Sequence, residues 1–111
     1  MPVPIPPADD APHLLVVDDD RRIRDLLSRF LSTEGYRIST AESGDEALQR
    51  IVADAPDLVL LDVMMPGLSG YDVCRTLRAD TRHAVLPIVL VTALDPTTER
   101  VKGLEAGADD F

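Results

Sequence analysis

The chain has 111 residues, about the length of one ordinary domain, and 45% of them are hydrophobic, which is enough to bury a core. Asp and Glu number 20 against 11 Lys and Arg, so the net charge of -9 argues against direct binding to nucleic acid or to an anionic membrane. A single cysteine excludes an intramolecular disulfide, and no apolar stretch approaches the roughly 18 residues of a membrane span. We therefore expect a cytoplasmic protein.

The first elements are a proline-rich tail, a buried strand and an amphipathic helix. Segment 1–12 holds five of the nine prolines, which favour an extended backbone, so we expect a disordered tail before a folded domain at 13–111. Residues 13–17 (HLLVV) are typical of a strand buried on both faces. They lead into three aspartates, Asp18 to Asp20, after which apolar residues at helical spacing from Ile23 to Leu31 predict a helix.

A second strand and helix follow, and then a third strand. Residues 36–41 alternate large and polar side chains, as a half-buried strand does, and Ser43 to Glu46 match a capping box that opens a helix. The apolar positions of that helix are Ala47, Leu48, Ile51 and Val52. Residues 58–61 (LVLL) predict a third buried strand that ends at Asp62, before a loop at 63–70 rich in glycine and proline.

The last predicted elements are a helix, a strand and a further helix. The apolar face of the first is formed by Val73, Cys74 and Leu77. Residues 88–91 predict a fourth strand, which ends at Thr92. Asp95 and Pro96 suit the cap and first residue of a helix that continues through Leu104.

Strands that alternate with helices imply an α/β fold with a parallel sheet and helices on both faces. We expect the flavodoxin-like doubly wound sheet, whose strand order is 2-1-3-4-5. This order places the carboxyl ends of strands one, three and four side by side. Asp18, Asp19, Asp62 and Thr92 are therefore predicted to converge.

Such a cluster of carboxylates suits phosphoryl chemistry assisted by a metal. Carboxylates repel one another unless a cation neutralises them, and Mg²⁺ is commonly held by one or two carboxylates together with a phosphate oxygen. Asp19 and Asp62 are our candidate direct ligands. Asp62, in the middle, is the best candidate nucleophile toward phosphorus, and the Thr92 hydroxyl could donate a hydrogen bond to a phosphoryl oxygen.

Four segments resemble the response-regulator receiver family of two-component signalling. They are LLVVDDD at 14–20, LVLLDVMMPGLSG at 58–70, PIVLVTA at 87–93 and GLEAGADDF at 103–111. The order and spacing of the acidic pair, the D-x-x-M-P-x-x-x-G pattern and the strand-terminal T-A are jointly specific. The resemblance covers nearly everything after the tail.

The resemblance implies a role for each residue of the predicted cluster. Asp62 would accept a phosphoryl group from the phosphohistidine of a sensor histidine kinase. Mg²⁺ would be bound by Asp19, Asp62 and the backbone carbonyl of Met64, with Asp18 acting through water, and Thr92 would be the switch. The domain would catalyse its own phosphorylation rather than act as a conventional enzyme, and would signal to an output domain or a downstream protein. A homodimer is also compatible with the family.

The resemblance also identifies what the chain lacks. The family carries a lysine shortly after the aromatic residue of its last strand, and Phe111 at that aromatic position is the last residue. We therefore expect a receiver domain truncated at its C-terminus, without this lysine, most of the fifth strand and the last helix. Strand four would then be an uncovered edge.

Other interpretations remain open at this point. The three aspartates could simply cap a helix, and a receiver-like interaction module that is not phosphorylated would fit the absent lysine. A phosphatase of the haloacid dehalogenase type is disfavoured, because Met64 stands where a second acid is expected. A flavin or nucleotide site is disfavoured by the lack of a P-loop or G-x-G-x-x-G motif. The kinase, signal, output domain and oligomeric state are not specified by the sequence.

Overall fold

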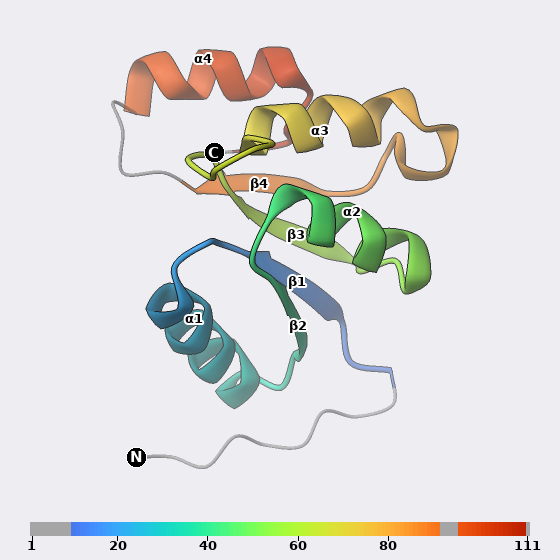
Figure 1. Ribbon diagram of the computed structural model, residues 1–111. Helices are drawn as coiled ribbons and strands as arrows, with labels where there is room; N and C mark the ends of the chain where they lie inside the picture. The colour runs from blue at the N-terminus through green and yellow to red at the C-terminus, as the bar shows by residue number, and fades with distance from the viewer. Residues whose placement is uncertain (1–9, 92–95, 111) are drawn as a thin grey trace.

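A computed structural model describes residues 10–91 and 96–110, and a parallel sheet forms its centre (Figure 1). Its elements are, in chain order, β1 (His13–Val17), α1 (Arg21–Thr33), β2 (Arg37–Ala41), α2 (Gly44–Ala53), β3 (Leu58–Asp62), α3 (Gly70–Ala79), the short 3₁₀ helix η1 (Thr81–His83), β4 (Ile88–Val91) and α4 (Pro96–Ala106). Most of the predicted tail, together with Thr92, Asp95 and Phe111, lies outside the described residues. Within the described ranges, no helix has the length and apolar character needed to cross a bilayer.

The four strands pair in the order β2-β1-β3-β4, and all three pairings are parallel. This confirms the first four positions of the predicted order. Beyond β4, Asp110 forms an isolated parallel bridge with Val89, and the Asp109 N–H donates to the Ile88 carbonyl at 2.9 Å. The edge of β4 is thus partly paired rather than uncovered, although no full fifth strand forms among the described residues.

A partly buried arginine, Arg78, holds this last segment in place. The Arg78 Nε donates to the Gly107 carbonyl at 2.7 Å, and its Nη1 donates to the Leu86 carbonyl at 2.7 Å. Its Nη2 donates to Asp109 Oδ2 at 2.9 Å, and the same carboxylate oxygen accepts the Ile88 N–H at 2.8 Å. Charge-assisted hydrogen bonds are stronger than neutral ones. The Arg78 side chain therefore ties α3 to the turn that follows α4.

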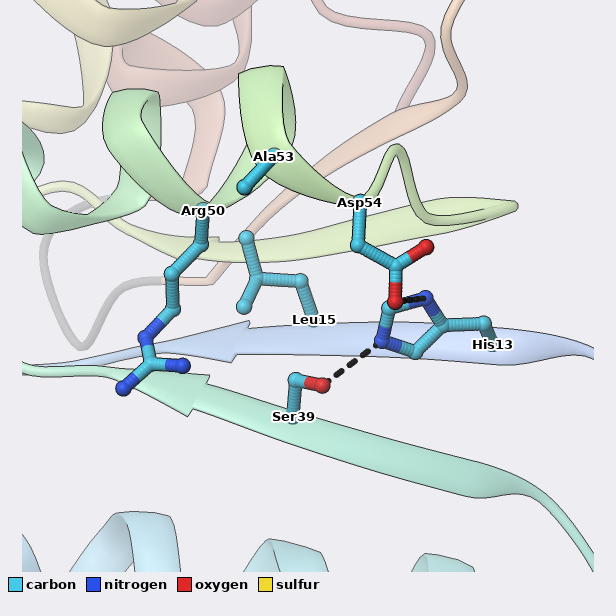
Figure 2. A pocket seen from close by; sticks show the side chains of 6 residues that line it. All are labelled: His13, Leu15, Ser39, Arg50, Ala53 and Asp54. Carbon is cyan, nitrogen blue, oxygen red and sulfur yellow. Dashed lines mark hydrogen bonds and ion pairs between the residues drawn. The ribbon is translucent and has the colours of Figure 1, made fainter.

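The amino-terminal half of β1 and the middle of β2 border a small cavity beside α2 (Figure 2). Its volume is about 120 Å³, and it is lined by His13, Leu15, Ser39, Arg50, Ala53 and Asp54. The buried His13 ring shares a 2.7 Å hydrogen bond between Nε2 and Ser39 Oγ, and its Nδ1 lies 3.9 Å from Asp54 Oδ2. Because His13 is the first residue of β1, this cavity lies at the opposite end of the strand from the aspartates.

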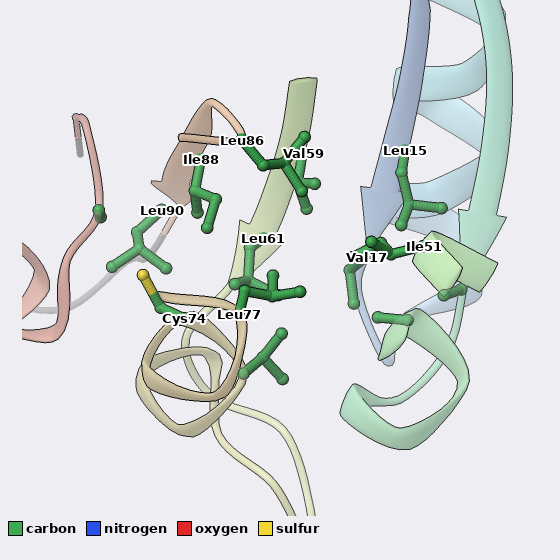
Figure 3. Packing of buried hydrophobic residues seen from close by; sticks show 14 of the residues in the cluster. Leu15, Val17, Ile51, Val59, Leu61, Cys74, Leu77, Leu86, Ile88 and Leu90 are labelled. Atoms are coloured by element: carbon green, nitrogen blue, oxygen red, sulfur yellow. The ribbon is translucent and has the colours of Figure 1, made fainter. Parts of the chain in front are cut away.

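The hydrophobic core lies between the sheet and helices α2 and α3 (Figure 3). All five residues of β1 are buried, as expected for a central parallel strand. The predicted face of α3 is also confirmed. The fully buried side chains include Leu15, Val17, Ile51, Val59, Leu61, Val73, Cys74, Ile88 and Leu90.

Two predicted apolar faces are buried less completely than their sequence patterns indicate. On α2, Ala47 and Ile51 are buried, but Val52 is 60% exposed. On α1, which packs against β1 and β2, Leu26 is 65% exposed and Phe30 is 60% exposed. Helical spacing identifies the side of a helix that is apolar, but not the width of the surface that covers it.

The contrast between buried and exposed valines provides a test of this core. Val73→Ala on α3 removes two methyl groups from a fully buried position, so we expect the free energy of unfolding to fall by about 2 kcal/mol. Val52→Ala makes the same chemical change at an exposed helical position, and its effect should stay within about 0.5 kcal/mol. Urea denaturation of both variants measures the difference. Equal losses of stability would contradict the assigned core.

Candidate functional site: an acidic cluster at the carboxyl edge of the sheet

Strand register brings three aspartates together. Val17 pairs with Leu61 in the β1–β3 ladder, and Asp62 is the last residue of β3. Asp18 is therefore the first residue past the end of β1, at the level of Asp62. One carboxylate oxygen from each of Asp18, Asp19 and Asp62 can be chosen so that all three lie within 4.8 Å of one another. The predicted convergence is confirmed for these residues, whereas Thr92 lies outside the described residues.

The three aspartates that follow β1, Asp18 to Asp20, have different structural roles. Asp18 Oδ1 accepts the Asp20 N–H at 2.9 Å, which closes a local turn after β1. Asp20 is the N-cap of α1: its Oδ1 accepts the Arg22 N–H at 2.8 Å, and hydrogen bonds from Arg22 lower the Asp20 pKa. The helix-capping interpretation thus holds for Asp20, while Asp18 and Asp19 belong to the cluster.

The loop after β3 is folded tightly against Asp62. The Met64 N–H donates to Asp62 Oδ1 at 3.3 Å, and the Gly70 N–H donates to the Val63 carbonyl at 3.0 Å. A Cβ atom on Gly70 would collide with the Asp62 carbonyl oxygen and lie 2.9 Å from the Val63 Cα. The glycine of the D-x-x-M-P-x-x-x-G pattern is thus required by this close approach.

The start of α3, which closes this loop, is also fixed by its capping residues. Ser69 and Asp72 form a complete capping box: the Ser69 hydroxyl accepts the Asp72 N–H at 3.2 Å, and the Asp72 carboxylate accepts the Ser69 N–H at 3.1 Å. These bonds satisfy backbone donors that the helix itself leaves unpaired. This capping box was not predicted from the sequence, although the spacing of Ser69 and Asp72 is the signal that could have identified it.

Two carboxyl groups of the cluster have raised pKa values, chiefly because they are partly buried. The pKa of Asp62 rises from 3.8 to about 6, first because burial disfavours its charged form and then because Asp18 and Asp19 repel it, while the Met64 N–H opposes the rise. The pKa of Asp18 is also raised, chiefly by burial. At neutral pH the cluster therefore concentrates negative charge that a cation can neutralise.

The donor set fits a hard divalent cation. Oxygen ligands of one octahedral Mg²⁺ ion lie at most about 4.2 Å apart, twice the metal–oxygen distance. Carboxylates within 4.8 Å of one another would need to close by only about half an ångström, or one of them would reach the ion through water. Asp18, Asp19 and Asp62 could thus hold such an ion together.

Comparisons with known proteins agree on one family. The family profile described as "Response regulator receiver domain" matches residues 14–111. The response regulator MprA of Mycolicibacterium vanbaalenii is 54% identical over 99 residues, which are 89% of this chain and 42% of that protein. The protein of the same name from Mycobacterium tuberculosis strain H37Ra is 53% identical over the same length. The chain thus spans less than half the length of these relatives.

Solved structures show the same likeness. A putative response regulator from Chloroflexus aurantiacus has a TM-score of 0.87 at 39% identity, with 91% of this chain and 83% of that chain covered. The BeF3-activated N-terminal receiver domain of Klebsiella pneumoniae RstA has a TM-score of 0.80 at 37% identity, with 88% and 81% covered. Both the fold and the sequence therefore match receiver domains.

The raised pKa of Asp62 predicts an unusual dependence of stability on pH. The folded state binds a proton at Asp62 more readily than the unfolded state does, so ionisation of this carboxyl lowers stability as the pH rises from about 4 to about 6. Asp62→Asn removes this penalty. In metal-free buffer we expect the variant to be more stable than the parent chain by about 1 kcal/mol at pH 7, after discounting for solvent screening, with the difference shrinking toward pH 4.

Asp25→Asn is the matched control, because the Asp25 side chain is exposed on α1 and is paired with Arg21 away from the cluster. Its stability difference from the parent should change little over the same pH range. Denaturation at several pH values measures both variants. A constant difference between Asp62→Asn and the parent from pH 4 to pH 7 would show that Asp62 titrates normally.

Proposed function

The chain belongs to the response regulator receiver domain family of two-component signalling, and on that premise we propose that Asp62 accepts a phosphoryl group from a histidine kinase. The observation that carries the proposal is the placement of Asp62 at the end of β3, within an acidic cluster formed with Asp18 and Asp19. A carboxylate in this position can act as a nucleophile while its neighbours hold a cation.

The proposed transfer exchanges one bond to phosphorus for another. A carboxylate oxygen of Asp62 forms the new O–P bond, the N–P bond to the kinase imidazole breaks, and the released imidazole nitrogen takes up a proton. Asp62 must be ionised to attack, and a pKa of about 6 leaves it mostly ionised at neutral pH. The Met64 N–H, which donates to Asp62 Oδ1, helps to orient the carboxylate.

We propose Mg²⁺ as the cation of this site. Asp19 and Asp62 are the proposed direct ligands, together with the Met64 carbonyl, and Asp18 is proposed to act through water. When bound, the ion neutralises charge that gathers on the phosphoryl oxygens. The raised pKa of Asp62 arises first from burial and then from repulsion by Asp18 and Asp19, and the repulsive part, which a cation would relieve, supports the assignment.

Thr92 is the proposed responder to phosphorylation. It follows Val91, which pairs with Asp62 in the β3–β4 register, so it is one residue along the chain from the partner of the phosphoacceptor. Its hydroxyl is proposed to donate to a phosphoryl oxygen and to couple the modification to repacking of the neighbouring segment.

We also propose partners and a location. Because the chain spans 42% of the length of MprA, an output domain or a downstream protein is proposed to receive the signal, and a sensor histidine kinase to supply the phosphoryl group. A homodimer is compatible with this scheme. Family membership and a buried free cysteine, Cys74, support a cytoplasmic location.

Phosphorylation can be tested directly with a small phosphodonor. Incubation with acetyl phosphate and Mg²⁺ should add the mass of one phosphoryl group to the parent chain and none to Asp62→Asn. Asp45→Asn, an exposed acid in the first turn of α2, is the control and should be modified like the parent. Intact-mass spectrometry measures the product. An unmodified parent chain would favour the alternative of an interaction module that is not phosphorylated.

Metal binding provides an independent test of the same site. Asp19→Ala removes a proposed direct ligand, so its Mg²⁺ affinity, measured by calorimetry, should fall at least about tenfold. Asp20→Ser is the control: it removes an equal charge from the adjacent residue but keeps an N-cap side chain for α1. Its affinity should stay within about threefold of the parent value, because its lost charge is partly screened. If both variants lost Mg²⁺ affinity equally, Asp19 would contribute only its charge and would not be a direct ligand.

A further inference from the structure

We propose that Arg24, the fourth residue of α1, is a positioning residue for the acidic cluster. Its Nη1 donates to the Asp18 backbone carbonyl at 2.7 Å, and only 14% of its side chain is exposed. The inference rests on the proposed function, because it assigns Arg24 the task of holding the loop that carries two of the proposed Mg²⁺-binding carboxylates.

Asp18 is the first residue after β1, where the hydrogen-bonding pattern of the sheet ends. β1 ends at Val17, and the Asp18 N–H still donates to the Ala41 carbonyl at 3.1 Å. The side chain of Asp18 accepts the Asp20 N–H. The hydrogen bond from Arg24 therefore fixes the carbonyl, the remaining polar group of this residue's backbone. With the N–H and the carbonyl both held, the peptide plane that leads to Asp19 has a defined orientation.

Arg24 also reaches the neighbouring loop. Its Nη2 lies 3.8 Å from Glu42 Oε2, and Glu42 directly follows β2. The Glu42 carboxylate is 69% exposed, so this ion pair by itself contributes little to stability. It does direct the second half of the guanidinium toward the end of β2 while the first half binds Asp18. Arg24 thus connects the loops that follow β1 and β2.

The charge of Arg24 and its positioning role predict opposite changes in Mg²⁺ affinity. A cation near three carboxylates lowers their affinity for Mg²⁺ by electrostatic repulsion, so loss of its charge alone should tighten metal binding. A positioning residue acts in the opposite direction, because its loss lets the Asp18–Asp19 loop move. The sign of the change in affinity therefore decides between the two roles.

The test compares the Mg²⁺ affinity of three variants by calorimetry. Arg24→Met keeps the aliphatic stem but removes the donors, and we expect its affinity to fall about tenfold, the lower end of the effect of groups that orient metal ligands. Arg24→Lys keeps one cationic donor for the carbonyl and should stay within about threefold of the parent. Arg21→Met is the control, because Arg21 is 84% exposed and pairs with Asp25. Its affinity should be unchanged or tighter.

Hydrogen exchange in metal-free protein gives a second measurement, which needs neither Mg²⁺ nor phosphotransfer. The Asp20 amide, which is bonded to Asp18 Oδ1, should exchange about tenfold faster in Arg24→Met than in Arg21→Met, because its acceptor is no longer held in place. The Val16 amide in β1 reports global opening. If the two amides accelerate equally, Arg24 only stabilises the fold, and the inference fails.

The outcomes also separate this inference from the proposed function. Arg24→Met that binds Mg²⁺ as tightly as the parent, or more tightly, overturns the positioning role. A parent chain that binds no Mg²⁺ overturns the proposed metal site instead, and the exchange of the Asp20 amide then judges the role of Arg24 by itself.

Discussion

The parallel register of β1 and β3 is the constraint on which the rest of the structure depends. Leu14 pairs with Leu58 and Val17 with Leu61, so two short buried strands run side by side and end at the same edge. A slip of one residue would exchange the two faces of a strand and disrupt the core beneath it. The residues that follow these apolar runs therefore meet at fixed positions, and they are aspartates. Apolar packing brings the like charges together.

In the part of the chain that the structure describes, backbone N–H groups donate hydrogen bonds to two carboxylates of the cluster. The Asp20 N–H donates to Asp18, and the Met64 N–H donates to Asp62. Arg24 is close by, and its guanidinium donates to the backbone carbonyl of Asp18. Burial of Asp62, and after it repulsion from Asp18 and Asp19, raises the pKa of this carboxyl to about 6. A cation placed among these carboxylates would relieve their mutual repulsion.

Several elements could be predicted because their sequence patterns have direct physical causes. A parallel strand in the middle of a sheet is buried on both faces, so β1 could be identified as an apolar run with the predicted bounds. β4 also has the predicted bounds, although it is the last strand of the sheet and is buried less completely. Helical spacing also identified α1, α2 and α3. It overestimated their burial at Val52, Leu26 and Phe30, because the width of a covered face depends on which elements pack there. The partial cover of β4 by Asp109 and Asp110 was missed because it depends on the bonds that Arg78 makes across the fold.

The sequence by itself determined which residues could form the site, since Asp18, Asp19 and Asp62 each follow a recognisable apolar strand. Only the tertiary structure decided that their carboxylate oxygens lie within 4.8 Å, that Gly70 must lack a Cβ atom, and that Asp20 caps a helix instead of joining them. The role of Arg24 was equally invisible, because its bond to the Asp18 carbonyl gives no sequence signal. The cluster, the close approach at Gly70, the cap at Asp20 and the Arg24 bond all depend on distances between residues in loops and neighbouring strands. Side-chain type and spacing specify the elements, and packing sets those distances.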